Sequence, residues 1–188
     1  MESSAGRANA LPAIEAAFEF LVSRYDYCLA QTTDIPSGAW YRAADRCVAV
    51  AYDFMRDAAL DVRLEERVSG DSFLLSELLG LQAPHLRRRP GVRERAHLLA
   101  EIESTVQQLE EQCADFLGGD LAAFYRRHRE AILVNRARAL AHEEFYRGDP
   151  RRAARLFGCL REYWDDVDRE HHDRALSGER PLGLLRAR

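Results

Sequence analysis

Two stretches of helical periodicity between Val92 and Leu140 dominate the hydrophobic pattern of the chain. In each stretch apolar residues recur mainly at spacings of three and four, which places them along one face of a helix. Gly118-Gly119-Asp120 separates the two, since glycine suits a helix end and aspartate suits the N-cap of the next helix. We therefore predict an antiparallel helical hairpin whose two stripes face one core. The first stripe is Val92, Ala96, Leu99, Ile102, Val106, Leu109, Cys113 and Phe116, and the second is Leu121, Phe124, His128, Ile132, Asn135 and Ala139.

The pattern changes closer to the N-terminus. Helical spacing holds from Leu11 to Leu21, and from Tyr25 apolar and polar residues alternate, as in a half-buried strand. The segment Thr32 to Gly38 is rich in turn-forming residues, so we expect a loop there. The expected strands are residues 25–30, 39–44, 47–53 and 60–65. Together they predict a small antiparallel meander over residues 25–66, with water on one face and helices on the other.

Helical patterns return after the meander. Ser72 is expected to cap a short helix, and Gly148 to end the second long helix of the hairpin. Asp149-Pro150 then predicts a new helix, because aspartate can cap it and proline fits its first position. Its apolar stripe is Ala153, Phe157, Leu160, Trp164 and Val167. The predicted fold class is α+β, a small antiparallel β-meander near the N-terminus packed on a predominantly helical bundle.

Length and composition favour one globular domain. The 188 residues are 47% apolar, which is enough for a core. We expect a single domain over residues 1–188, with a helix and the meander in 1–70, a helical part in 71–176 and a loosely held tail in 177–188. Neither an apolar run of about 18 residues nor a signal-peptide pattern is present. The expected location is therefore the cytoplasm, away from membranes, with four cysteines that form no disulfide.

Candidate chemistry is sparse. His171-His172-Asp173 after an acidic run offers metal-ligand types, but adjacent histidines on a helix point about 100° apart, so a solvated helix end is favoured. His128 and Asn135 interrupt an apolar stripe and belong either to hydrogen-bonded structure, which we favour, or to a pocket. We found no recognisable local frame for a nucleophile, a phosphate loop or a metal site. We accordingly expect no catalytic residue, cofactor or metal.

Charge bears on the choice of partner. All 27 basic residues are arginines, against 31 acidic residues, and the net charge of −4 gives no overall attraction to nucleic acid. An arginine cluster could contact phosphates, although glutamates lie nearby and no aromatic residue is interleaved. That cluster is Arg87, Arg88, Arg89, Arg93 and Arg95. The expected partner-binding residues are acidic and fall at polar positions of their elements; they are Asp61, Glu65, Asp165, Asp166, Asp168 and Glu170. Solubility alone is the alternative explanation for these acids.

Five segments follow one another along the chain: residues 47–53 and 60–64 of the meander, then 72–79, 116–124 and 145–153. In that order they resemble segments of a loose group of small bacterial cytoplasmic proteins of uncharacterised function. Some of that group look like immunity proteins, which bind and neutralise polymorphic toxins. The Gly148-Asp149-Pro150 joint also resembles half of a tetratricopeptide unit, without a 34-residue period.

The resemblance and the acidic positions together suggest a non-enzymatic protein-binding module of a bacterial cytoplasm. Immunity-like neutralisation of a basic toxin is one form of that function. A helical scaffold or adaptor is an alternative, as is an enzyme whose site is assembled from distant residues.

Overall fold

The structure is a computed structural model that describes residues 10–34, 37–53, 59–80 and 95–178. It is an α+β protein, as predicted, with an antiparallel sheet followed by helices. The chain forms two compact units, Met1–His128 and Arg129–Arg188, where one domain was expected. The boundary falls inside the predicted helical part, because the helices before His128 pack with the sheet while those after it pack with each other.

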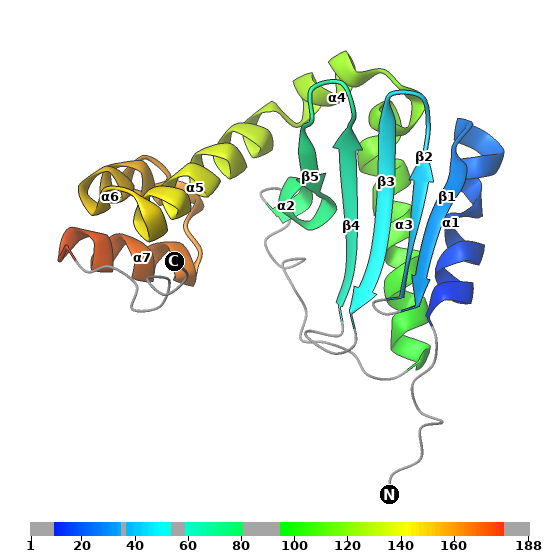
Figure 1. The fold of residues 1–188 in the computed structure, drawn as a ribbon, viewed down its shortest axis with the longest axis horizontal. Coiled ribbons are helices and arrows are strands. Elements are labelled where there is room, and N and C mark those ends of the chain that lie inside the picture. Colours follow the sequence, from blue (N-terminus) through cyan, green and yellow to red (C-terminus); the bar gives the residue numbers. More distant parts are fainter. Residues whose placement is uncertain (1–9, 35–36, 54–58, 81–94, 179–188) are drawn as a thin grey trace, which may run out of the picture. The chain divides into compact units, whose positions relative to one another are not determined.

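The first unit is built on five strands that pair in chain order, each antiparallel to the next (Figure 1). Consecutive strands joined by short connections form such a meander most simply. The strands are β1 (Cys28–Asp34), β2 (Ser37–Arg42), β3 (Arg46–Asp53), β4 (Ala59–Glu66) and β5 (Ser72–Leu74).

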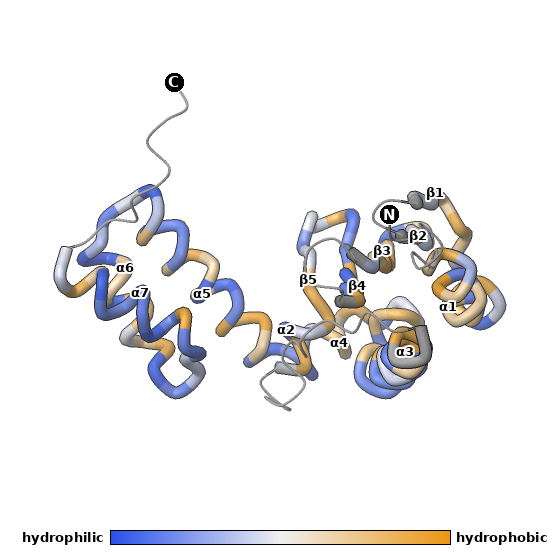
Figure 2. The backbone as a smooth tube through the Cα atoms, turned by 90° about the horizontal axis from the view of Figure 1, so that it is seen from below, coloured by the Kyte–Doolittle hydropathy of each residue, from blue (hydrophilic) through white to orange (hydrophobic). Residues whose placement is uncertain are grey.

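Alternation along the central strands decides which face of the sheet is covered. Val48 and Val50 of β3 lie beside Leu64 and Val62 of β4, and all four are buried. Asp61 of β4 points to the opposite face and is exposed. Figure 2 shows the long helices on one side of the sheet, and no described helix of the first unit covers the other side, as predicted.

The described residues of the first unit form four helices, and the two long ones lie on one side of the sheet. The four helices are α1 (Leu11–Tyr25), α2 (Leu75–Gly80), α3 (Arg95–Gly118) and α4 (Leu121–Arg127). Phe18 of α1 stacks on Tyr41 of β2 with 6.3 Å between ring centroids. Arg46 of β3 donates to the carbonyl oxygen of Leu117 at the end of α3, where the helix dipole favours a cation. Gly119 follows with φ of +87°, and a Cβ there would lie 2.9 Å from Arg46 Nη1, so this turn requires glycine.

Two predictions about the strands are wrong. The expected loop at residues 32–38 is instead a hairpin, since β1 and β2 stay paired as far as Asp34 and Ser37. Residue 72 begins β5 and not a helix: Phe73 pairs with Leu64 of β4, and the helix starts only at Leu75. In both places pairing with a neighbouring strand prevails over the local preference for turns or helix.

The predicted helical hairpin is correct only as far as Arg127. Asp120 caps α4 as expected, accepting a hydrogen bond from Ala123 N at 2.9 Å. The second helix then breaks at His128, and its continuation belongs to the other unit, so the two stripes do not share one core. The first stripe is also shifted at its start, because Leu98 is buried and Leu99 is 41% exposed.

The second unit is a small cluster of helices with its own core. The elements are α5 (Arg129–Arg147), α6 (Pro150–Cys159), a 3-10 turn (Arg161–Tyr163) and α7 (Asp166–Leu176). The core consists of Ala141, Phe145, Ala153, Ala154, Phe157 and Ala175, with Leu156 and Trp164 packed against it. Asp149 caps α6 with Pro150 in its first turn, as predicted. The predicted stripe, however, ends at Leu160: α6 stops there and Val167 is exposed. None of the helices in the described ranges combines the length and apolar character that a membrane span requires.

Candidate functional site

A groove runs between α1 and α3 in the first unit. Its volume is about 410 Å³, and its lining is Ala17, Glu103, Val106, Gln107, Glu110 and Glu111, which we call the α1–α3 groove. Ala17 faces α3 because the buried stripe of α1, with Phe18 and Leu21, turns toward the sheet. The groove therefore combines an apolar floor with carboxylates around it.

Some groups of the groove are already paired. Arg24 of α1 donates to Glu110 Oε1 at 2.6 Å, and its side chain is 62% exposed. Gln107 donates to Glu111 Oε1 at 2.7 Å, one helical turn away. With three carboxylates and one guanidinium, the groove keeps a negative charge.

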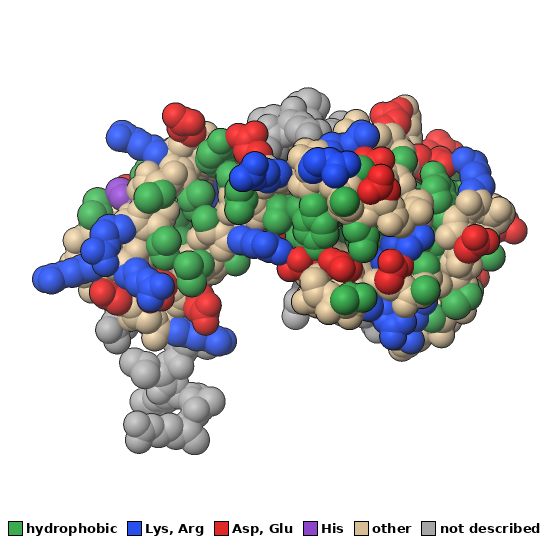
Figure 3. Space-filling model, turned by 90° about the horizontal axis from the view of Figure 1, so that it is seen from above, with side chains coloured by type: hydrophobic (Ala, Val, Ile, Leu, Met, Phe, Trp, Pro, Cys, Tyr) green, Lys and Arg blue, Asp and Glu red, His purple; other side chains and the backbone are tan. Residues whose placement is uncertain are grey.

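The negative charge of the chain is concentrated in α1 and α3. These helices hold seven of the 31 acidic residues and two of the 27 arginines, which leaves the rest of the chain close to neutral. In the view of Figure 3, acidic and basic side chains are interspersed over both units. The acidity is therefore a property of the helices that cover the sheet, and not of the surface as a whole.

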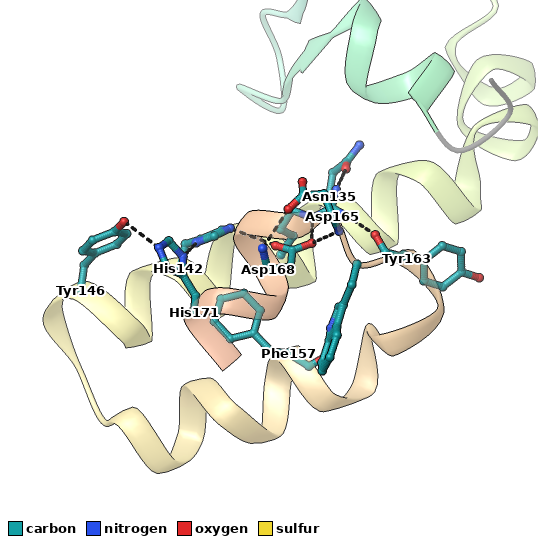
Figure 4. A network of polar contacts seen from close by, with 10 residues as sticks. Asn135, His142, Tyr146, Phe157, Tyr163, Asp165, Asp168 and His171 are labelled. Atoms are coloured by element: carbon teal, nitrogen blue, oxygen red, sulfur yellow. Dashed lines mark hydrogen bonds and ion pairs between the residues drawn. The ribbon is translucent and has the colours of Figure 1, made fainter. Parts of the chain in front are cut away.

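A second cluster of polar side chains lies within the second unit and centres on Asp168 of α7 (Figure 4). The Asp168 side chain is completely buried. Its Oδ2 accepts from Arg138 Nε of α5 at 2.8 Å, while Arg138 Nη2 donates to the carbonyl oxygen of Tyr163 at 2.6 Å. Asp168 also closes a capping box with Asp165 at the start of α7. Although burial opposes its charge, His142 and Arg138 hold the pKa of Asp168 below its ordinary value.

His142 joins Asp168 to a second histidine. Its Nε2 lies 3.2 Å from Asp168 Oδ1. Its Nδ1 lies 3.1 Å from Nδ1 of His171 on α7. His171 Nε2 in turn lies 3.3 Å from the hydroxyl of Tyr146 on α5. The histidine network thus runs from Arg138 through Asp168, His142 and His171 to Tyr146.

Aromatic rings enclose the histidines of this network. Phe145 stacks on His171 at 4.6 Å between centroids, and Phe157 of α6 meets the edge of His142 at 5.1 Å. Burial, followed by the neighbouring His142, lowers the pKa of His171. Each member of the network contacts another member, so its polar groups serve to join α7 to α5.

The expected acidic residues are divided between the two units. Asp61 is exposed and Glu65 half-buried on the open face of the sheet, whereas the other four lie in the second unit. Of these, Asp166 and Glu170 are exposed, but Asp165 is the N-cap of α7. The expectation for Asp168 is wrong, because the network above buries it and makes it structural.

Other sequence candidates have structural partners or lie outside the described residues. His128 is buried, with its Nε2 2.9 Å from the carbonyl oxygen of Gln112, and Asn135 accepts from Arg138, which fits the structural alternative. His171 is buried, so the expected solvated helix end is wrong at that residue. The arginine cluster falls largely in residues 81–94, outside the described ranges. Burial raises the pKa of Cys113 to about 12, which disfavours its thiolate.

Both sites depend on pairings of residues that sequence reasoning did not find. His142 and His171 are 29 positions apart, and Ala17 is far from Val106, so local spacing held no signal for either pairing. Within the described residues, no group of three or more histidine, cysteine or acidic side chains is arranged to hold a metal ion. Comparisons of the chain with protein families, with curated proteins and with solved structures found no match.

Proposed function

We propose that this protein is a non-enzymatic binding protein that takes a basic segment of a partner protein into the α1–α3 groove. The observation that carries the proposal is the apolar floor of Ala17 and Val106 beside three carboxylates. Grooves of this kind bind a partner through buried apolar contact and use charge for selectivity.

Arginine and lysine side chains fit both parts of such a groove. Their aliphatic stems can lie on Ala17 and Val106 while their charged ends reach Glu103 or Glu111. A guanidinium and a carboxylate form charge-assisted hydrogen bonds, which are stronger than neutral ones. A basic segment with alkyl stems therefore matches the groove better than an acidic or a purely apolar segment.

Arg24 supports this fit from within the chain. Its contact with Glu110 shows that a guanidinium can occupy the edge of the groove. Arg24 is largely exposed and Glu110 partly exposed, and ion pairs at the surface contribute about 1 kcal/mol or less. An incoming basic side chain can therefore replace Arg24 at Glu110 at little cost.

The negative charge of α1 and α3 also favours a basic partner. Seven acidic residues on two adjacent helices would attract a basic partner before contact and speed association. A basic toxin is one such partner, and immunity-like neutralisation in a bacterial cytoplasm is the form of the proposal that the sequence resemblance suggests. The surface proposed is the helical one and not the open face of the sheet.

Charge reversal in the groove tests the proposal. The probe is a fluorescein-labelled peptide of about ten residues, rich in arginine and leucine, titrated by anisotropy. The variant Glu103→Arg/Glu111→Arg should bind this peptide about tenfold more weakly than the unmodified protein, since two nearby favourable charges become repulsive. The matched control, Asp166→Arg/Glu170→Arg, makes the same change in net charge on exposed residues of α7 and should bind as the unmodified protein does. Equal weakening in both variants, or affinity that ignores salt, would contradict binding in the groove.

A further inference from the structure

The contact between the two histidines of the second unit limits how many protons they can hold. Two Nδ1 atoms 3.1 Å apart form a hydrogen bond only when one carries a proton and the other offers its lone pair. If both rings were cationic, two N–H groups would point at each other. The contact is therefore compatible with at most one proton between the rings.

The remaining partners allow the whole chain of contacts to be satisfied with neutral rings. His142 Nε2 faces the Asp168 carboxylate and so carries a proton, which leaves its Nδ1 as the acceptor for His171 Nδ1–H. His171 Nε2 can then accept from the Tyr146 hydroxyl. In this arrangement each O–H or N–H group donates to the next group, from Tyr146 through His171 and His142 to Asp168. The other oxygen of Asp168 accepts from Arg138.

Two carboxylates favour a cationic His171, but each already has an arginine partner. From α5 the groups facing the pair are Arg138 and Tyr146; from α7 they are Asp168, Glu170 and Arg174. Asp168 is already paired with Arg138, and Glu170 is exposed and lies 3.4 Å from Arg174. The charge of Glu170 favours a cationic His171, but burial and His142 oppose it more strongly. From α6 the apolar ring of Phe157 faces the pair. A cationic His171 would thus be buried between aromatic rings next to another imidazole.

We propose that the contact between His142 and His171 is a pH-sensitive switch that holds α7 on α5 near neutral pH and loosens α7 in mild acid. The two rings lie on different helices, so losing the contact removes a direct link between them. Further polar contacts also link α5 to α7, namely Tyr146 with His171 and both His142 and Arg138 with Asp168. Of these, the Arg138 guanidinium does not titrate in this range.

The direction of the pH effect follows from the lowered pKa of His171. The unfolded state takes up a proton near the ordinary value of 6.5, while the folded state resists it to lower pH. The stabilisation from neutral His171 is therefore complete above about pH 6.5 and is lost as the pH falls below it. The pKa of Asp168 lies below the ordinary value of 3.8, so Asp168 stays charged in this range. The stabilisation that its charge provides is lost only in stronger acid.

Hydrogen exchange measured by mass spectrometry on the full chain tests the switch. Between pH 7 and pH 5, after correction for chemical exchange, protection of α7 should fall by about tenfold as local opening of the helix becomes easier. Protection of α1 in the same sample should stay constant. In His171→Phe, which keeps a ring against Phe145 but cannot titrate, α7 should show no such fall. The control His172→Gln, changed at a neighbouring histidine packed on Trp164, should behave as the unmodified protein does.

The proposal is overturned if α7 of the unmodified protein keeps its protection at pH 5, or if His171→Phe loses protection to the same extent. Should His171→Phe not fold, imidazole resonances of the unmodified protein give the same decision. His171 should titrate below 6.5, and the amide signals of α7 should shift with the same midpoint. A His171 titration at or above 6.5, or α7 signals that do not follow it, would exclude the switch.

Discussion

Asp168 is completely buried, and partners from another helix stabilise the charge of its carboxylate. Arg138 and His142 of α5 face its two oxygens, and the backbone of the α7 cap binds it as well. Removing a charge from water costs several kcal/mol, and the mutual attraction of a buried pair offsets this only when the geometry is good. The pair therefore contributes little as a whole, but either member alone is costly.

Replacing Asp168 by asparagine should destabilise the second unit by about 3 kcal/mol or more, because Arg138 is left without its counter-charge. Urea unfolding followed by the emission of Trp164 measures the change. The exposed neighbour provides the control: Asp166→Asn should alter stability by about 0.5 kcal/mol or less.

The same residue sets a second expectation in acid. Since the pKa of Asp168 is lowered in the folded state, its contribution is present above 3.8 and is lost as the pH falls below that value. Asp168→Asn should show no such loss. A variant as stable as the unmodified protein at pH 7 would mean that Arg138 finds another partner.

The burial of Asp168 could not be predicted from the sequence, because its partners lie far away along the chain. Asp168 and Arg138 are 30 positions apart, and nothing in the local pattern of α7 distinguishes Asp168 from its exposed neighbour Asp166. His128 was easier, because a polar residue within an apolar stripe already marks it as facing inward. Residues whose role arises from distant contacts need the fold before they can be assigned.

Helix ends show what local sequence can specify. Asp120 and Asp149 both cap the helices predicted for them, since the cap bonds to atoms only two or three positions along the chain. The break at His128 was not predicted. At this break His128 Nε2 contacts the carbonyl oxygen of Gln112 on α3, which is 16 positions away along the chain. The short strand β5 and the β1–β2 hairpin were missed for the same reason, because strand pairing creates them.

The cap of α6 gives an energetic test of this local control. In Asp149→Ala the backbone N–H of Arg151 loses its acceptor, which should cost about 1 kcal/mol. Asp149→Asn keeps a side-chain oxygen at the cap and should recover most of the loss. Both values come from urea unfolding observed at Trp164. Equal destabilisation by the two substitutions would assign the effect to charge and not to capping.

Because the chain forms two units, we expect a destabilising substitution in one unit to leave the other unit folded. Each unit has its own buried cluster: the first is centred on the sheet with Phe18, Leu109 and Phe116, and the second on Phe145 and Phe157. One domain was predicted because the helical periodicity continues across His128, and periodicity does not reveal which core a given turn faces. The amino-acid composition indicates that the chain can form a hydrophobic core, but it does not indicate whether there is one core or two.

Leu109→Asp tests this division directly. Leu109 is fully buried in α3, and an unpaired carboxylate there should cost several kcal/mol, comparable with the stability of a small domain. Each unit has one tryptophan, Trp40 in the first and Trp164 in the second, so Trp164→Phe and Trp40→Phe backgrounds report the units separately. The emission of Trp40 should become that of an unfolded chain, while Trp164, whose indole N–H donates to the carbonyl oxygen of Phe157, keeps its native signal. Leu99→Asp, on the same helix but at an exposed position, should leave both signals unchanged. Simultaneous loss of both signals in Leu109→Asp would show that the two units fold as one cooperative structure.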